Sequence, residues 1–495
     1  MHSSRIVIIG GGFSGIGMAI RLRQQGIDDF VILERAAEHG GTWRDNSYPG
    51  CACDVQSSLY SFSFAPNPDW SRSYAPQAEI WAYLRRCATA YDIDRHFVFS
   101  QNVTGASWDN DTQRWTVTTT SDVFRSNAVV MASGALSDPI LPDIPGLHAF
   151  NGPMFHSAQW NHDLDLRGKR VAVIGTGASA IQFIPQIQPL VAHLDVFQRT
   201  PPWVLPRDDA AVAQWRRSLY RAVPMTQRVV RGALYVQREL LHVPFRNRRA
   251  ARVVEWLSHR FMQSQVTDPA LRARLVPDYR IGCKRILVSD DYYPALQQPN
   301  VSLITDAITS IDAHGVCTAA GARHTADVIV LGTGFRPTDP PLAPAVVGRD
   351  GVSLARAWNA SPRAYMGTTV AGFPNLFLLL GPNTALGHSS VLMMIEAQIA
   401  HVLGVLSLTQ SRDAAAAEPL ESAQRAYVAA LDARLATTTW NAGGCHSWYL
   451  DRTGRNSTLW PDGVGRFERT VSHVNAAAYR FDPRRATAGA RIAHV

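Results

Sequence analysis

The chain has 495 residues, of which 46% are hydrophobic and 18% are charged, and its formal net charge is +8. This length exceeds that of one small binding module and predicts two or three domains, and the composition excludes a disordered or coiled-coil chain. The N-terminal run MHSSRIVIIGGG is too short and too polar at its flanks for a signal peptide. No stretch approaches the roughly 18 apolar residues of a membrane span, so we expect a cytoplasmic protein without an integral membrane segment.

A dinucleotide-binding pattern opens the chain, as a β-branched run, a cluster of glycines and a helical pattern within the first 26 residues. Gly10 would make the turn, Gly12 would let backbone N–H groups approach a pyrophosphate, and Gly15 would let helix and strand pack closely. A second predicted strand ends in Glu34, 19 residues after Gly15. A carboxylate there accepts hydrogen bonds from a ribose diol, so the pattern predicts a dinucleotide without a 2′-phosphate.

The same pattern recurs from residue 171, where a β-branched run leads into the turn Gly175–Ala180. Here the second strand ends in Arg199 and Thr200, with Arg199 19 residues after Ala180. A guanidinium and a hydroxyl at this position suit a 2′-phosphate. The second site is therefore predicted to hold NADPH.

Two dinucleotide sites in one chain imply electron transfer between two cofactors, and FAD with NADPH is the most economical pair. The six cysteines are too sparse for a disulfide scaffold, and none forms a C-x-x-C pair. The closest pair, Cys51 and Cys53, lacks the spacing of a typical zinc site, so we expect no metal and assign the cysteines structural or neutral roles. A disulfide reductase would need an adjacent redox dithiol, so O2 is the predicted electron acceptor.

Two segments resemble signatures of the type I Baeyer-Villiger monooxygenases, the ketone-oxygenating branch of the class B flavoprotein monooxygenases. The stretch from Gly40 to Asp54 matches the pattern G-G-x-W-x-x-x-x-Y-P-G-x-x-x-D at every specified position. Residues 150–160 match F-x-G-x-x-x-H-x-x-x-W, although Asn161 stands where that branch has Pro or Asp. The shorter pieces ASG, LGTGF and GPN follow in the family's order, so the resemblance covers nearly the whole chain.

The resemblance implies that NADPH reduces FAD, that oxygen forms a peroxide on flavin C4a, and that one oxygen atom enters next to a ketone carbonyl to give an ester or lactone. It makes Arg285 the partner of the peroxide anion, since arginine stays protonated, and it makes Asp54 the residue that orients this guanidinium. Lys284 would join Arg199 and Thr200 at the 2′-phosphate.

The other predicted cofactor contacts are Gly10, Gly12, Phe13, Ser14, Gly15, Glu34, Arg35, Gly41, Thr42, Trp43, Tyr48, Asp54, Tyr60, Gly175, Thr176, Gly177, Ala178, Ser179, Ala180, Asn383 and Trp448. The second signature implies hinge or structural roles for Phe150, Gly152, His156 and Trp160.

The order of these patterns predicts an α/β fold with two Rossmann-like dinucleotide-binding domains. We expect the first part of the FAD domain in residues 1–140, the NADPH domain in 141–328, and the second part of the FAD domain, with a C-terminal mobile loop, in 329–495. Helical periodicity interrupted by prolines predicts a helical insertion at about 208–275 within the NADPH domain.

The positive charge of the chain is concentrated in this insertion. Residues 212–260 hold 11 arginines and two acidic residues, a net charge of +9, which leaves −1 for the rest of the sequence. Such basic helices either cap a substrate path or contact a membrane surface peripherally. Because the excess does not lie on the cofactor folds, we expect no nucleic-acid partner.

The leading interpretation is an FAD- and NADPH-dependent Baeyer-Villiger monooxygenase that acts on a hydrophobic ketone and O2. Asn161 keeps an N- or S-oxygenating flavin-containing monooxygenase as the alternative. A remoter alternative is a flavoprotein that acts by membrane-surface binding through its basic helices.

Overall fold

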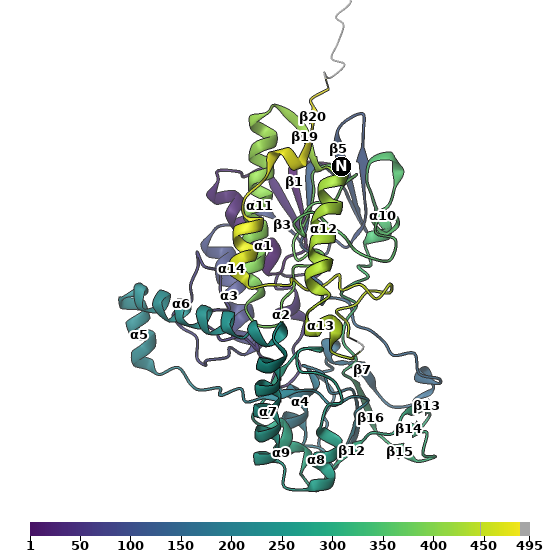
Figure 1. Ribbon diagram of the computed structural model, residues 1–495. Coiled ribbons are helices and arrows are strands. Elements are labelled where there is room, and N and C mark those ends of the chain that lie inside the picture. Colours follow the sequence, from purple (N-terminus) through teal and green to yellow (C-terminus); the bar gives the residue numbers. More distant parts are fainter. Residues whose placement is uncertain (446, 486–495) are drawn as a thin grey trace, which may run out of the picture.

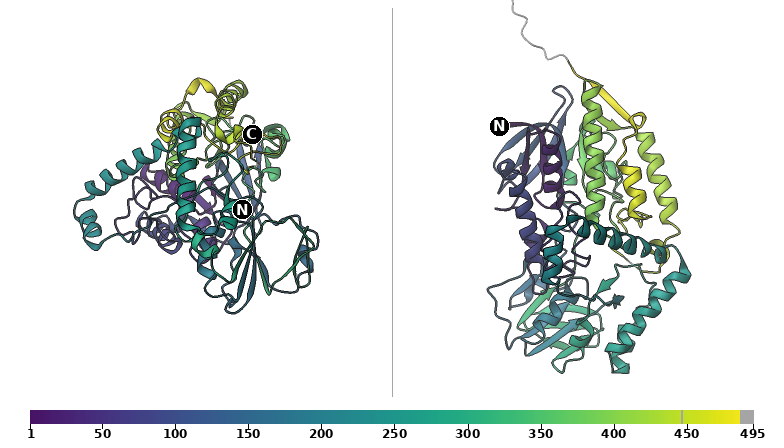
Figure 2. Two further views of the ribbon diagram at one scale, coloured as in Figure 1. Left: turned by 60° about the horizontal axis from the view of Figure 1, so that its bottom comes forward. Right: turned by 90° about the vertical axis from the view of Figure 1, so that its left-hand side faces the viewer.

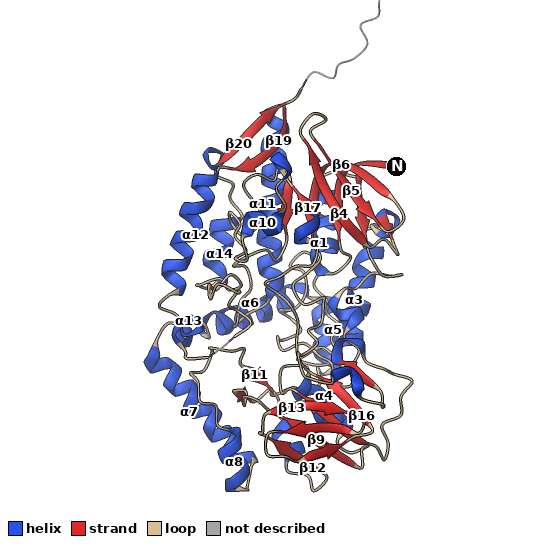
Figure 3. Ribbon diagram, turned by 90° about the vertical axis from the view of Figure 1, so that its right-hand side faces the viewer, coloured by secondary structure: helices blue, strands red, loops and turns tan. Residues whose placement is uncertain are grey.

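Two α/β units, each built around its own sheet, form the computed structural model, which describes residues 1–445 and 447–485 (Figures 1 and 3). The sheets lie at opposite ends of the molecule in Figure 3, and loops and helices connect them. Each sheet contains one of the two expected glycine turns, so the predicted class of two Rossmann-like domains is confirmed.

The larger sheet holds the first glycine turn. Its order is β17 (Val346–Val347), β4 (Val103–Asp109), β5 (Arg114–Thr119), β6 (Val123–Met131), β1 (His2–Ile9), β2 (Phe30–Leu33) and β3 (Phe97–Val98), and β18 (Leu376–Leu378) also pairs with β6. β1 is parallel to β2 and β6, and the last four residues of β1 are buried. Parallel strands buried on both faces explain the continuous apolar run of β1, which helices cover. These helices include α1 (Phe13–Gln24), α3 (Gln77–Ala90) and α11 (Val391–Ser411).

Helix α11 corrects one expectation, because it is long and apolar enough to cross a membrane by length and composition. It packs instead against α1, β19 (Ala414–Pro419) and α14 (Val464–Val471), and 56% of its most apolar window is buried. Its hydrophobicity is therefore that of a core helix. The C-terminal part is completed by α12 (Glu421–Leu435), α13 (Thr439–Ala442) and β20 (Tyr479–Pro483), and α2 (Thr42–Asp45) and α10 (Leu354–Trp358) lie earlier in the chain.

The smaller sheet holds the second glycine turn and is entirely parallel. Its order is β12 (Val301–Ile304), β9 (His193–Phe197), β8 (Arg170–Ile174), β16 (Val328–Leu331) and β7 (Met154–His156), with α4 (Ala180–Ile187) and α9 (Tyr292–Leu296) packed together in its core. An antiparallel sheet of β13 (Ile308–Asp312), β14 (Gly315–Thr318) and β15 (Arg323–Thr325) lies alongside. The boundary expected between 328 and 329 cuts through β16, so the chain returns to the larger unit only after Leu331.

Helices occupy most of the expected insertion. They are α5 (Gln214–Ala222), α6 (Pro224–Leu240), α7 (Arg248–Gln265) and α8 (Pro269–Leu275), between β10 (Val204–Leu205) and its partner β11 (Leu287–Val288). Pro224 occupies the first turn of α6, where its missing N–H costs nothing, and Pro244 lies between α6 and α7. Figures 1 and 2 show α5 and α6 projecting away from both sheets.

Candidate functional site

The first glycine turn forms one wall of a cleft at the carboxyl end of β1. Gly10 has φ +109°, and a Cβ on it would lie 2.6 Å from the carbonyl oxygen of Ala132, so glycine is required there. A Cβ on Gly15 would overlap the carbonyl oxygen of Gly10. A Cβ on Gly12 would lie 3.6 Å from the Cα of Gly41, so the turn faces a second glycine pair across the cleft.

The cleft has a volume of about 550 Å³ and suits the pyrophosphate and ribose of FAD. Two features make this cleft fit FAD: the closely packed glycine backbone, which lets a pyrophosphate approach, and the buried Glu34 carboxylate after the second strand. Predicted contacts that line it are Gly10, Gly12, Phe13, Ser14, Glu34, Arg35, Gly41, Thr42 and Trp43.

Glu34 is held in place by the chain itself. Its carboxylate accepts hydrogen bonds from the backbone N–H groups of Gly11 (2.7 Å) and Ala36 (3.0 Å) and pairs with Arg44 at 3.1 Å. Arg44 also lines the cleft and pairs with Asp45, and the sequence reasoning missed it. Its position directly after Trp43 in the first signature was the available signal.

The predicted contacts of the larger unit that lie outside the lining of this cleft include Gly15, Tyr48, Asp54, Tyr60 and Asn383. The hydroxyl of Tyr60 accepts a hydrogen bond from Trp43 Nε1 at 3.0 Å, which places Tyr60 behind a lining residue. The Asn383 side chain donates to the carbonyls of Asn456 (2.7 Å) and Leu459 (3.1 Å) and accepts from Arg455. Asn383 therefore ties the C-terminal segment together.

Tyr48 belongs to a loop that joins the two units. Its hydroxyl donates to Gln182 Oε1 on α4 at 2.9 Å, and Gln182 Nε2 donates to the carbonyl of Ala52 at 3.0 Å. A Cβ on Gly50, where φ is +78°, would lie 2.7 Å from the carbonyl oxygen of Gln182. The first signature therefore spans the interface: its N-terminal part lines the cleft, and its C-terminal part rests on α4.

The second glycine turn begins at Gly175, which has φ +110° and whose Cβ would lie 2.5 Å from the carbonyl oxygen of Gly332. Gly177 leaves open space in front of the start of α4, where a helix N-terminus favours phosphate. Arg199 is exposed beyond β9, and burial together with the Arg199 charge lowers the pKa of Lys284. These two cations therefore lie close together, an arrangement that an anion such as a 2′-phosphate would stabilise.

Arg285 and Asp54, 231 residues apart in sequence, form an ion pair. Asp54 Oδ2 accepts hydrogen bonds from two guanidinium nitrogens of Arg285, Nε at 2.7 Å and Nη2 at 2.5 Å. Asp54 raises the pKa of Arg285, and although burial alone would raise the pKa of Asp54, the Arg285 charge keeps that pKa below its usual value. The Arg285 and Asp54 side chains are 32% and 28% exposed, so the pair remains accessible.

Tyr449 is a neighbour of this pair that sequence reasoning did not identify. It is 1% exposed, and burial raises its pKa to about 12, partly offset by Arg285. The adjacent Trp448 is 40% exposed and packs on Tyr449 with ring centroids 4.5 Å apart. Tyr449 thus lies in the same segment as Trp448, for which the sequence predicts a cofactor contact.

The second signature lies where the chain passes between the units. His156 is buried at the end of β7, its Nδ1 accepts from the N–H of Ala158 at 3.1 Å, and burial lowers its pKa. Trp160 packs against Phe183 of α4 at 5.3 Å, and a Cβ on Gly152 would lie 2.5 Å from the carbonyl oxygen of Asp327. These contacts pack the segment against the smaller unit, and its role as a hinge stays a prediction.

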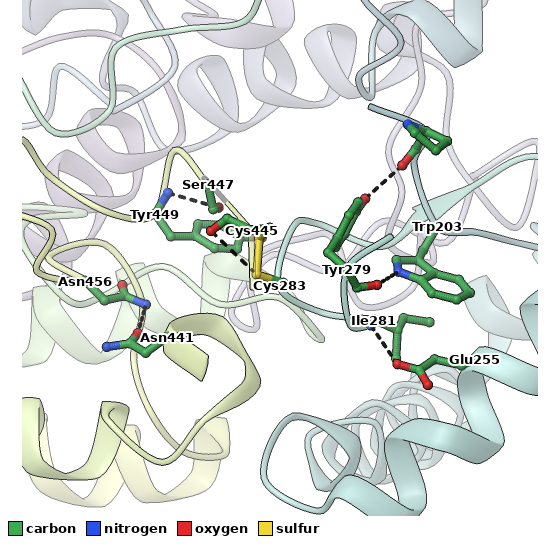
Figure 4. Close-up of a disulfide and its surroundings, with 11 residues drawn as sticks. Trp203, Glu255, Tyr279, Ile281, Cys283, Asn441, Cys445, Ser447, Tyr449 and Asn456 are labelled. Carbon is green, nitrogen blue, oxygen red and sulfur yellow. Dashed lines mark hydrogen bonds between the residues drawn. A yellow bond between two sulfur atoms is a disulfide. The ribbon is translucent and has the colours of Figure 1, made fainter. Parts of the chain in front are cut away.

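A disulfide joins Cys283, which precedes Arg285 by two residues, to Cys445 (Figure 4). The sequence separation of 162 residues carries no signal for such a bond, so the sequence did not predict it, although a disulfide is within the structural or neutral roles expected of the cysteines. Cys51, Cys53, Cys87 and Cys317 are free cysteines in the described part of the chain.

Comparisons with known proteins agree with this geometry. Residues 7–215 match the model of the pyridine nucleotide-disulphide oxidoreductase family. The chain is 48% identical to a protein of Streptomyces coelicolor named Baeyer-Villiger monooxygenase, over 99% of this chain and 95% of that one. A closed crystal structure of cyclohexanone monooxygenase superposes with a TM-score of 0.88 at 27% identity, over 98% of this chain and all of that one. A structure of OTEMO with FAD and NADP gives 0.86 at 26% identity, over 97% and 99%.

Proposed function

The chain belongs to the Baeyer-Villiger monooxygenases, and we propose that Arg285, oriented by Asp54, is the residue that enables its oxygen-transfer step. The enzyme uses FAD and NADPH to insert one atom of O2 next to a ketone carbonyl. This activity is favoured over N- or S-oxygenation and over a purely surface-binding role. The Arg285–Asp54 pair is the observation that carries the residue assignment.

Bound FAD would supply two-electron transfer from NADPH and the reaction with O2. The chain would hold it between the first glycine turn and the facing Gly40–Gly41 pair, and through Glu34, whose carboxylate stands at the ribose end of the cleft. Arg199, Thr200 and Lys284 would hold the 2′-phosphate of NADPH, because two neighbouring cations and a hydroxyl match that dianion.

Arg285 suits oxygen transfer because its charge is permanent and already fixed in direction. Asp54 occupies Nε and one terminal nitrogen, which leaves the remaining N–H groups to face negative charge that develops on the transferring oxygen. A preorganised donor of this kind contributes about 3 kcal/mol to such a step. Burial raises the pKa of Tyr449 to about 12, so the side chain is neutral at physiological pH. Its buried ring therefore excludes water beside Arg285 without adding charge.

The Arg285→Ala variant tests this assignment. We expect NADPH still to bleach the bound flavin, whereas ester or lactone formation falls by about two orders of magnitude, because only the oxygen-transfer step loses its cation. Product is measured by gas chromatography with a cyclic ketone and flavin reduction by stopped-flow absorbance. Arg167→Ala, at an exposed position of the smaller unit, is the matched control. Undiminished product from Arg285→Ala would remove Arg285 from the mechanism.

The proposed substrate class is a hydrophobic ketone, and the enzyme is proposed to act in the cytoplasm. A second partner is suggested by α6, whose polar side faces the protein: Gln227 donates to Asn67 (2.6 Å), Arg231 to the carbonyl of Ser61 (3.0 Å) and Arg238 to Gln56 (2.7 Å). Its apolar residues point outward at helical spacing, namely Met225, Val229, Val236 and Leu240, which are 57–65% exposed.

Helix α7 also carries exposed apolar side chains, Val253, Trp256 and Leu257, among arginines, and they are counted with those of α6 as one basic apolar surface. Twelve of the nineteen exposed large hydrophobic side chains in the described residues lie between 215 and 257. Pairing two copies here would bring together two segments, residues 212–260, whose sequence carries a formal net charge of +9, so the charge favours an anionic partner. We infer that this surface contacts the anionic cytoplasmic leaflet, which accepts apolar and arginine side chains together.

Sedimentation with lipid vesicles tests this contact. The holoenzyme should bind vesicles that contain phosphatidylglycerol at physiological salt and release them at high salt. Val229→Ser with Val236→Ser should weaken binding about tenfold or more, because the membrane-bound protein loses the contacts of two valine side chains with the lipid. Leu190→Ser with Leu420→Ser, which changes exposed leucines elsewhere, is the control. Absence of binding, or formation of a dimer through this face, would contradict the proposal.

A further inference from the structure

A covalent bond joins the two chain segments that meet at the Arg285 site. Cys283 immediately precedes Lys284 and Arg285, and its sulfur is bonded to Cys445 of the C-terminal segment (Figure 4). Four residues after Cys445 comes Tyr449, whose buried ring lies beside Arg285. The disulfide therefore connects the cations of the proposed cofactor site to the segment that covers them.

On one side, the Cys283 segment is anchored within the NADPH unit. Trp203 Nε1 donates to the carbonyl of Tyr279 at 2.9 Å, and the N–H of Ile281 donates to Glu255 of α7 at 3.1 Å. The N–H of Leu287 donates to the carbonyl of Trp203 at 2.9 Å. Lys284 and Arg285 thus lie in a short stretch whose two ends are fixed.

On the other side, the same stretch meets the C-terminal segment at a closely packed point. The N–H of Arg280 donates to the carbonyl of Gly443 at 3.1 Å, and a Cβ on Gly443 would lie 2.6 Å from the Cβ of Cys283. Glycine at this position lets the two segments approach closely enough for the bond. Asn456 Nδ2, which donates to Asn441 Oδ1 at 3.0 Å, fixes the end of α13 just before Cys445.

We propose that the Cys283–Cys445 disulfide is a reversible tether that positions Lys284 for NADPH, together with the adjacent Arg285, whose proposed role is oxygen transfer. In the oxidised state it holds these residues under the Tyr449 segment, and in the reduced state the two segments separate and NADPH is held more weakly. The inference rests on the proposed roles of Lys284 and Arg285. The cysteines are positioning residues, because they act through their neighbours.

Formation of the bond requires an oxidant of the hydroperoxide class. The two thiols lose two protons and two electrons, hydrogen peroxide accepts them with cleavage of its O–O bond, and one S–S bond and two waters result. A monooxygenase of this class supplies that oxidant whenever NADPH, a proton and O2 give NADP⁺ and hydrogen peroxide without a ketone being oxidised. The disulfide would therefore form under the conditions in which NADPH oxidation gives hydrogen peroxide instead of an oxygenated product.

Opening of the bond requires a dithiol. One reductant thiolate attacks the sulfur of Cys445, which is partly exposed, whereas Cys283 is 1% exposed. The Cys283 thiolate leaves next to Lys284 and Arg285 in the chain, and neighbouring cations stabilise a thiolate. The second reductant thiol then displaces Cys445, so two protein thiols and one reductant disulfide result.

Thiol counting tests whether the bond exists and opens. The holoenzyme is treated with hydrogen peroxide or with dithiothreitol, alkylated after denaturation and weighed by mass spectrometry. We expect the four cysteines that the structure leaves free to be alkylated after peroxide, and two more after dithiothreitol. Cys283→Ser with Cys445→Ser should give four in both cases. Six alkylated cysteines in the peroxide-treated wild-type enzyme would overturn the proposal.

Affinity for NADP⁺, measured by equilibrium dialysis of the two thiol states, tests the positioning role without turnover. The dissociation constant should rise about fivefold or more on reduction and return on reoxidation. The double serine variant should stay at the reduced value, and Cys317→Ser, in the antiparallel sheet of the NADPH unit, should respond like the wild type. Equal affinities in states that differ in thiol count would overturn the proposal. Loss of ester formation in both states would instead reject the proposed function while leaving these measurements intact.

Discussion

The Arg285–Asp54 pair shows how single residues acquire a role from partners distant in the sequence. Each residue is common on its own, yet the fold brings the guanidinium and the carboxylate to 2.5–2.7 Å. The surrounding burial works against both charges, and their mutual attraction keeps both ionised. The charge that the proposed oxygen-transfer step needs is thus fixed before any substrate arrives.

Asp54→Asn should therefore destabilise the protein in a pH-dependent way. The folded-state pKa of Asp54 lies below its unfolded value, so the contribution of the pair is complete above pH of about 4 and disappears as the pH falls through the folded pKa. We expect the free energy of unfolding to drop by about 2 kcal/mol at neutral pH, with the difference shrinking in acid. Urea titrations at several pH values measure this. A difference that grows in acid would contradict the assignment.

Sequence patterns located residues that belong to contiguous motifs and missed those that depend on long-range packing. Glu34 lines the cleft and Asp54 pairs with Arg285, as their motif positions indicate, whereas the cofactor and catalytic roles of these residues and of Lys284 stay predictions. Tyr449 and the Cys283–Cys445 bond depend on how the C-terminal segment folds back onto the NADPH unit, and no local spacing encodes that return. Asn383 is a motif residue whose side chain joins loops in this structure, and its predicted cofactor contact stays a prediction.

At the scale of elements, the strand, turn and helix at the start of the chain are determined by backbone contacts that only glycine allows. Both glycine turns adopt the same φ, +109° at Gly10 and +110° at Gly175, and both press against a carbonyl of a neighbouring strand end. Local steric rules therefore made these elements predictable. The burial of α11 and the outward apolar side of α6 were harder to predict from the sequence, because composition alone does not say which face a helix buries.

Gly15→Ala should release FAD from the larger unit. The new Cβ would overlap the carbonyl oxygen of Gly10, so α1 must move away from β1 and the cleft must deform. We expect the purified variant to be nearly colourless at the flavin absorbance band and to unfold at lower temperature. Gly232→Ala is the matched control, since its Cβ meets open space within α6 and alanine favours helix by about 1 kcal/mol. A yellow, stable Gly15→Ala protein would refute this reading of the turn.

At the scale of the whole molecule, the two units are held together by the loop of the first signature and by the disulfide. Tyr48 packs in the hydrophobic core of the smaller unit, although it closely follows the residues of the larger unit that line the FAD cleft. A Rossmann pair of this kind needs a defined relative orientation, because the nicotinamide and the flavin must meet at the interface. The hydrogen bonds of Gln182 to Tyr48 and Ala52 fix that orientation at the loop of the first signature.

Tyr48→Phe tests the interface without emptying it. Phenylalanine keeps the edge contact with Phe183, whose ring centroid lies 6.0 Å away, and loses only the hydrogen bond to Gln182. Stability should fall by about 1 kcal/mol and FAD content should stay unchanged, because the cleft lining is intact. Flavin reduction by saturating NADPH should slow about fivefold, since small misorientation between units lowers the population of the reactive geometry. An unchanged reduction rate together with the expected loss of stability would show that the hydrogen bond stabilises the loop without orienting the two units.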